Sequence, residues 1–87
     1  MAQEKFEQLI GEWIELSDII TVDVDKTYYI QNRGPDVLVA CEGSSEPVSE
    51  EGVLVQPYKV LKYKKGADDL YLRAFANNCS INITSEG

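Results

Sequence analysis

The chain has 87 residues, a formal net charge of −7 and no histidine. The length is that of one domain, and a composition of 44% hydrophobic and 26% charged residues argues against a wholly disordered chain. Without histidine, the chain lacks the usual general base and the usual nitrogen ligand of zinc. We therefore expect no enzymatic activity, no catalytic residues, and no metal or other cofactor.

The first residues predict a helix in front of a β-rich body. Five apolar residues recur at the three-and-four spacing of one helix face, namely Phe6, Leu9, Ile10, Trp13 and Ile14. Gly11 interrupts this pattern, so a second interpretation ends the helix there and makes 13–16 a strand. The predicted organisation is a single domain, 1–87, with an amphipathic helix at 1–16 and a β-sandwich at 17–87. The helix face either caps the core or forms an interface.

The rest of the chain predicts short strands. Alternating or β-branched runs lie at 20–24, 28–31, 37–41, 53–55, 58–63, 70–75 and 79–84. A turn is expected at 33–36 and an exposed loop at 42–52. The regular spacing, and the lack of helical periodicity between strands, predict an antiparallel β-sandwich or small barrel.

The charges divide along the chain. Residues 1–56 carry three basic side chains and twelve carboxylates, a net charge of −9, whereas 57–87 carry five and three, a net charge of +2. The basic part interleaves lysines with aromatic residues: Tyr58, Lys59, Lys62, Tyr63, Lys64 and Lys65. We predict an edge strand that lysines protect from unwanted pairing. An acidic protein partner is a second interpretation, while the acidity of the whole chain argues against a nucleic acid.

Several smaller motifs have simple structural interpretations. Asp23 and Asp25 lack the further ligands of a calcium loop and suggest a solvated strand edge. Asn82 matches a glycosylation acceptor pattern, but its alternating strand predicts an outward polar side chain. We expect Cys41 and Cys79 to be two buried thiols rather than a disulfide, because no signal peptide and no membrane segment is predicted.

Over residues 27–84 the order of these signals resembles small virion proteins of tailed bacteriophages. The motifs are Tyr-Ile-Gln-Asn-Arg-Gly at 29–34, Val-Leu-Val-Ala at 37–40, Pro47 followed by Gly-Val-Leu-Val at 52–55, Leu-Arg-Ala within 71–74, and the closing hairpin at 77–83. The resemblance implies a β-sandwich that decorates a phage head or belongs to a tail or fibre. The acidic N-terminal segment departs from the plainest members of that group.

The resemblance also carries expectations about partners. It implies a non-enzymatic virion protein, made in the cytoplasm of the host bacterium, that forms a homo-oligomer, with a trimer favoured. Its partners would be phage structural proteins, with no nucleic acid and no membrane. The five apolar residues of the predicted helix are the expected interface. The alternative function is an acidic inhibitor whose carboxylates, in rows on one face, mimic nucleic acid in the groove of a host enzyme.

Overall fold

The computed structural model describes residues 2–48 and 52–86 of the chain. Strands dominate, and the only helical element in these residues is a single 3-10 turn, η1 (Leu16–Asp18). The strands are β1 (Ala2–Ile10), β2 (Ile14–Glu15), β3 (Thr27–Pro35), β4 (Leu38–Gly43), β5 (Val53–Val55), β6 (Val60–Lys64), β7 (Asp69–Ala74) and β8 (Asn78–Glu86).

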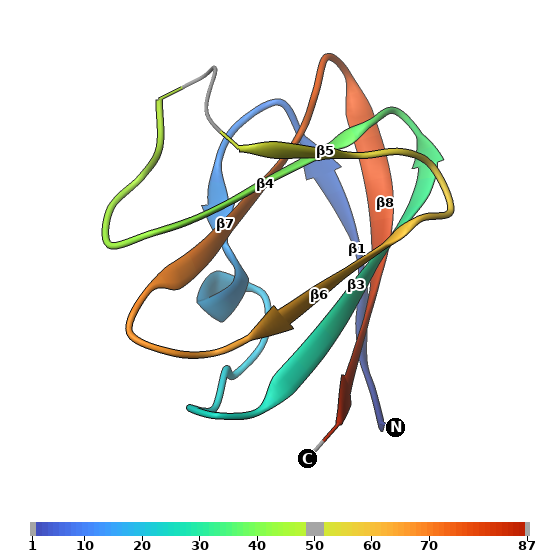
Figure 1. Cartoon of the computed structure of the whole chain (residues 1–87). Coiled ribbons are helices and arrows are strands. Elements are labelled where there is room, and N and C mark those ends of the chain that lie inside the picture. The colour runs from blue at the N-terminus through green and yellow to red at the C-terminus, as the bar shows by residue number, and fades with distance from the viewer. Residues whose placement is uncertain (1, 49–51, 87) are drawn as a thin grey trace.

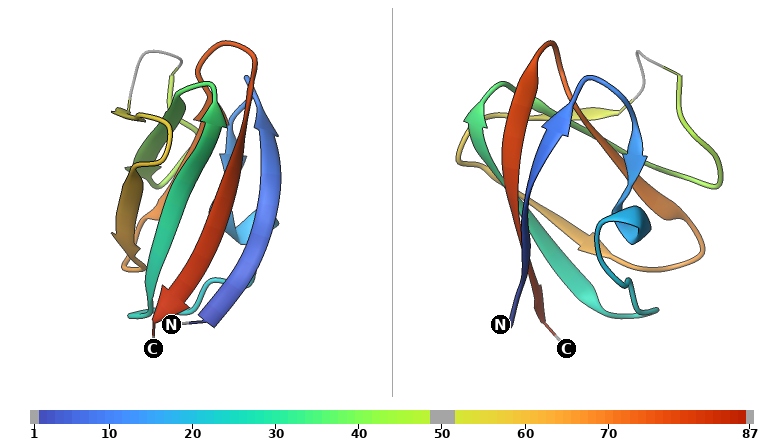
Figure 2. Two further views of the ribbon diagram at one scale, coloured as in Figure 1. Left: turned by 90° about the vertical axis from the view of Figure 1, so that its right-hand side faces the viewer. Right: turned by 180° about the vertical axis from the view of Figure 1, so that it is seen from behind.

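The strands form two antiparallel sheets that face each other, so the predicted β-sandwich is confirmed and no closed barrel forms in this part of the chain. Sheet A has the strand order β1-β8-β3-β6, and sheet B has the order β2-β7-β4-β5 (Figure 1). Short connections link each strand of sheet A to its counterpart in sheet B: β1 to β2, β3 to β4, β5 to β6, and β7 to β8. Figure 2 shows the strands of sheet A side by side, with both chain ends at one end of the sheet.

The core lies between the sheets and follows from the two-residue alternation of the strands. On β8, for example, Cys79, Ile81 and Ile83 are fully buried, while the intervening side chains point outward. The buried cluster contains Leu9, Leu16, Tyr28, Ile30, Leu38, Ala40, Val55, Tyr63, Leu70, Leu72, Ala74, Cys79, Ile81 and Ile83. Burial of these apolar side chains is the main term that stabilises the sandwich.

The predicted N-terminal helix at 1–16 is wrong. The segment Ala2–Ile10 is strand β1 and pairs with β8 along its length, with one irregularity between Gln3 and Lys5. The apolar residues have helical spacing but lie on both faces of the strand: Phe6 and Ile10 point outward, whereas Leu9 points into the core from the opposite face. A lone helix of about 12 residues is only marginally stable, so a full ladder of hydrogen bonds to β8 outweighs it.

The other predicted elements are largely confirmed. The runs at 28–31, 37–41, 53–55, 58–63, 70–75 and 79–84 correspond to β3 to β8. The predicted strand at 20–24 is wrong, because this segment is a loop whose Ile20 and Val22 pack against the core. The buried Tyr28 hydroxyl accepts a hydrogen bond from the Asp23 amide at 2.8 Å, so the backbone there is satisfied without a ladder.

Asn32, on β3, joins two of the connections between the sheets. Its side chain is fully buried, and its amide group donates to the carbonyls of Asp36 (2.9 Å) and Val55 (2.8 Å). Its side-chain oxygen accepts from the Gly34 amide at 2.7 Å. The Asn32 backbone also bonds to Tyr58 and Lys59 beyond β5. One buried side chain thereby fixes the β3–β4 connection against the β5–β6 connection.

The Asp36 carboxylate fixes a third connection. It accepts hydrogen bonds from the amides of Ala76 (2.6 Å) and Asn77 (2.8 Å) in the β7–β8 connection, and from the Val37 amide at 2.7 Å. These bonds, led by the one from Ala76, lower the pKa of Asp36 below its ordinary value of 3.8. The ionised form is therefore the one that holds the connections together.

We expect the free energy of unfolding to decrease on acidification, and to decrease less in the Asp36→Asn variant than in the wild type. The pKa of Asp36 is lowered by folding, so its contribution is present above the pKa of the unfolded chain and is lost as the pH falls below about 4. Urea unfolding at pH 7 and pH 3 measures it. Asp18→Asn, at an exposed carboxylate, is the control. An equal pH dependence in wild type and Asp36→Asn would contradict this role.

Candidate interaction surface

The structure does not bring the five predicted interface residues together. Phe6 and Ile10 are exposed on the outer face of sheet A. Leu9 is in the core, and Ile14 packs against it. Trp13 is half-buried, with the Arg73 guanidinium 5.0 Å from its ring centroid. Only Phe6 and Ile10 therefore point to the same surface, and their part in an interface stays a prediction.

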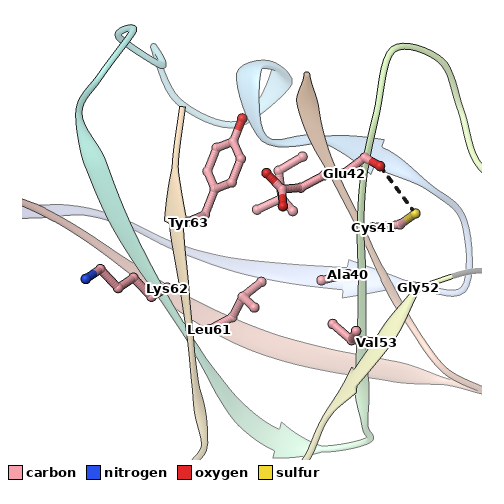
Figure 3. A pocket seen from close by; sticks show the side chains of 9 residues that line it. Ala40, Cys41, Glu42, Gly52, Val53, Leu61, Lys62 and Tyr63 are labelled. Carbon is pink, nitrogen blue, oxygen red and sulfur yellow. Dashed lines mark hydrogen bonds between the residues drawn. The ribbon is translucent and has the colours of Figure 1, made fainter. Parts of the chain in front are cut away.

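A groove opens between the two sheets on the side of β5 and β6. Its volume is about 300 Å³, and Figure 3 shows its lining. The floor is apolar, with Ala40, Val53, Leu61 and Leu70, while Lys62 lies at the rim and points away from Leu61. The other lining residues are Cys41, Glu42, Gly52 and Tyr63. We call this groove and the two strands that border it the open side.

The open side exists because β5 is short. β5 pairs with Leu38–Ala40 of β4, whereas the next three residues of β4, 41–43, pair in the described structure only with β7. On the opposite wall, β6 pairs with β3 and is the last strand of sheet A. In the described structure the unpaired edge of β6 therefore borders an apolar groove, an arrangement that offers a place for another strand.

Exposed apolar side chains concentrate at the open side. Among the described residues, nine large hydrophobic side chains are exposed, and four of them lie on β5, β6 or the turn between them. These are Val53 (56% exposed), Leu54 (56%), Tyr58 (66%) and Val60 (54%). Val53 lines the groove, whereas Leu54 lies on the outer face of sheet B and Val60 on the outer face of sheet A. Scattered single residues need no explanation, but apolar side chains in and on both sides of a groove indicate a binding surface.

The charge of the open side is positive on β6, which confirms the prediction of a lysine-rich edge strand. Lys62 and Lys64 are exposed, and they share the outer face of sheet A with Val60. The ion pairs of residues 2–48 and 52–86 involve neither of them. Lys65, by contrast, is held by Asp69 at 2.8 Å, a bond that raises the pKa of Lys65. Lys62 and Lys64 therefore remain available to a partner.

The inward side chains of β6 are held by the core. Tyr63 is buried and donates a hydrogen bond from its hydroxyl to the Asp68 carbonyl at 2.8 Å. Burial raises the pKa of this phenol, so the hydroxyl stays protonated at neutral pH. Leu61 is partly buried and packs against the core. The strand that borders the groove is therefore rigidly placed.

The outer face of sheet A differs from the open side, because uncharged polar groups dominate it. Two rows of paired residues cross the sheet: Gln3, Thr84, Tyr29 and Lys62, and then Phe6, Asn82, Gln31 and Val60. Asn82 points outward, as predicted, and accepts a hydrogen bond from the Gln3 amide group at 2.6 Å. Tyr29 donates to the Glu86 carboxylate at 2.8 Å, a bond that raises the pKa of Tyr29.

Cys41 and Cys79 are thiols and form no disulfide, as predicted. Cys79 is buried in the core, and desolvation raises the pKa of its thiol to about 11. Cys41 is only half-buried and lies at the groove, where its thiol faces the Glu42 carbonyl at 3.7 Å (Figure 3). The expectation of two buried thiols therefore holds for Cys79 alone.

Clustered metal-ligating side chains and membrane-spanning helices are both absent from residues 2–48 and 52–86. Within the described ranges, no three histidine, cysteine or acidic side chains are grouped so that they could hold a metal ion. Asp23 and Asp25 lie in the loop before β3 rather than on a strand edge. None of the helical segments in the same residues has the length and apolar character needed to cross a membrane.

Sequence reasoning missed the groove, although two signals pointed toward it. The apolar run at 53–55 is unusually short, and alternating lysines follow it on the next strand. Comparison with known proteins adds nothing to these observations: no protein-family model, curated protein or solved structure matches the chain.

Proposed function

We propose that the chain is a non-enzymatic structural protein of a phage or prophage particle that binds its neighbours through surface complementarity. The observation that carries the proposal is the open side, where an apolar groove, the unpaired edge of β6 in the described structure and four exposed apolar side chains occur together. The order of sequence motifs over 27–84 supports a place in a head, tail or fibre.

Shape and apolar area are what the open side offers a partner. Covering Val53, Leu54 and Val60 would remove more than half of each side chain from water. At about 1.5–3 kcal/mol for complete burial of such a side chain, their removal from water would contribute roughly 3–5 kcal/mol before entropic costs. This is a useful share of the affinity that holds subunits together, and further copies of the chain are natural partners.

The distribution of carboxylates does not favour the alternative, an acidic mimic of nucleic acid. A mimic needs regular rows of carboxylates on one face, whereas the two rows across the outer face of sheet A contain none. Many described carboxylates lie instead in separate connections between strands, Asp18 at the end of η1 and the others in loops: Glu12, Asp23, Asp25, Asp36, Glu46 and Asp68. The twelve carboxylates of residues 1–56 also include Glu50 and Glu51, which lie outside the described residues.

Incorporation into particles tests the proposal. Particles induced from a bacterium that carries the gene are purified on a density gradient, and the chain is quantified by mass spectrometry. We expect many copies per particle, and a loss of at least about tenfold in the double variant Leu54→Glu, Val60→Glu, since buried charges oppose docking.

The control for this experiment is Thr21→Glu, which adds a charge at an exposed residue of the loop before β3, away from both Phe6 and the open side, and should be incorporated normally. Circular dichroism checks that all variants fold. If the wild-type chain stays with free proteins at the top of the gradient, it is not a particle protein.

A further inference from the structure

We infer that the open side accepts an extended acidic segment of a partner protein, which adds to sheet A as a fifth strand beside β6. This inference rests on the proposed function and names the chemistry of the partner at the same surface. Three observations carry it: the unpaired edge of β6, the apolar groove behind that edge, and the lysines on its outer face.

The unpaired edge of β6 supplies the backbone contacts. In the described structure β6 pairs with β3 on one side and with no strand on the other. An incoming strand would satisfy the free amides and carbonyls of Val60–Lys64, and this ladder gives affinity without regard to side-chain identity. The adjacent turn is held by bonds from the Asn32 backbone to Tyr58 and Lys59, so the edge is preorganised for docking.

The groove selects apolar side chains at alternate positions of the incoming strand. Neighbouring residues of paired strands point to the same face, so a residue beside Leu61 would point between the sheets. There it would meet Ala40, Val53 and Leu70, which line the groove. At about 300 Å³ the groove is at the small end of ligand sites, which suits one or two aliphatic side chains.

The lysines select acidic side chains at the positions between. Lys62 and Lys64 lie on the outer face of β6, so the outward residues of an added strand would lie beside them. Carboxylates at those positions would pair with the ammonium groups. Basic segments would be repelled, and neutral segments would bury the lysines without compensation. Lys62 and Lys64 therefore oppose pairing with basic and neutral strands and favour pairing with an acidic strand.

The matching pattern is an alternation of acidic and small aliphatic residues. We test it with a capped heptapeptide in which aspartate occupies the odd positions and valine the even positions. Amide signals of the ¹⁵N-labelled full chain are followed by NMR during titration. We expect saturable shifts at Val60–Lys64 and at Ala40, slower hydrogen exchange of the β6 amides, and affinity that decreases with added salt.

Three control peptides separate the contributions of charge, apolar contact and backbone hydrogen bonding to the affinity. Lysine in place of aspartate removes the charge match, serine in place of valine removes the apolar contacts, and N-methylation on the edge facing β6 removes the ladder. Each should weaken binding at least tenfold. Equal binding of the N-methylated peptide would show that no backbone ladder forms and would overturn strand addition, and equal binding of the serine peptide would overturn the selection of apolar side chains by the groove.

Protein variants locate the site. The double variant Lys62→Glu, Lys64→Glu should lose at least tenfold in affinity, whereas Lys5→Glu, on the opposite edge strand β1, should not. No shift at β6 with millimolar peptide, or shifts confined to β1, would overturn the inference. If the chain is present in particles but does not bind the peptide, the proposed function stands and this partner is wrong. If the chain binds the peptide but is absent from particles, the partner stands and the proposed function is wrong.

Discussion

Replacing Asn32 with alanine should lower the free energy of unfolding by about 3–5 kcal/mol, because the change leaves buried backbone groups without partners. The lost bonds are those to the Asp36 carbonyl, the Val55 carbonyl and the Gly34 amide. A domain of this size has a total stability of only about 4–13 kcal/mol, so the variant would be close to unfolding. Urea unfolding followed by circular dichroism measures the change.

The control is Asn82→Ala, which removes an asparagine from the outer face of sheet A. Its side chain is half-buried and exchanges one hydrogen bond with an exposed glutamine, so we expect a loss of less than about 1 kcal/mol. Asn32→Asp is a second variant that preserves shape but replaces the amide donor group with a buried carboxyl oxygen that faces the two carbonyls. If Asn32→Asp were as stable as the wild type at pH 7, the bonds to Asp36 and Val55 would not hold the connections together.

Replacing Gly52 with alanine should cost about 2–4 kcal/mol and displace β5 from β4. Gly52 has a φ of +108°, a conformation that side-chain-bearing residues rarely adopt. A Cβ atom there would lie 2.7 Å from the Ala40 carbonyl oxygen and 3.1 Å from Cγ1 of Val39. The oxygen belongs to the β4 backbone, so the clash can be relieved only by moving a strand.

Gly66→Ala is the matched control for this variant, because a Cβ atom at Gly66 meets nothing within 4 Å. We expect its free energy of unfolding to lie within about 0.5 kcal/mol of the wild type. Urea unfolding ranks the two variants, and hydrogen exchange at Val53–Val55 reports whether β5 has loosened. Equal stability of the two variants would show that β5 does not depend on the tight approach of Gly52 to β4.

Alternation predicted most of the sandwich, because alternation is what a strand with one buried face requires. The runs at 70–75 and 79–84 identify β7 and β8 for this reason. The error at the N-terminus has the same origin. Residues 6, 9 and 10 fit a helix face by spacing alone, and only the partner strand β8, more than 60 residues away, shows that they lie on two faces of a strand.

The role of Asn32 could not be predicted from its neighbours. Within Gln-Asn-Arg-Gly-Pro, an asparagine is typical of an exposed turn, whereas its actual partners include a carbonyl 23 residues further along the chain. The groove depends in a similar way on pairing register. That β5 covers only Leu38–Ala40 of β4 follows from which strands meet, and local composition contains no information about that.

The position of β8 within sheet A has a consequence for the folding of the newly synthesised chain. β8 lies between β1 and β3, so the first and last strands in sequence are adjacent in space. β1 cannot pair until β8 has been synthesised, and before that β3 has only β6 as a neighbour in its sheet. Because these pairings join segments far apart in sequence, the high contact order predicts a slow folding rate, in the range of milliseconds to seconds. During that interval the nascent polypeptide is a natural client for chaperones.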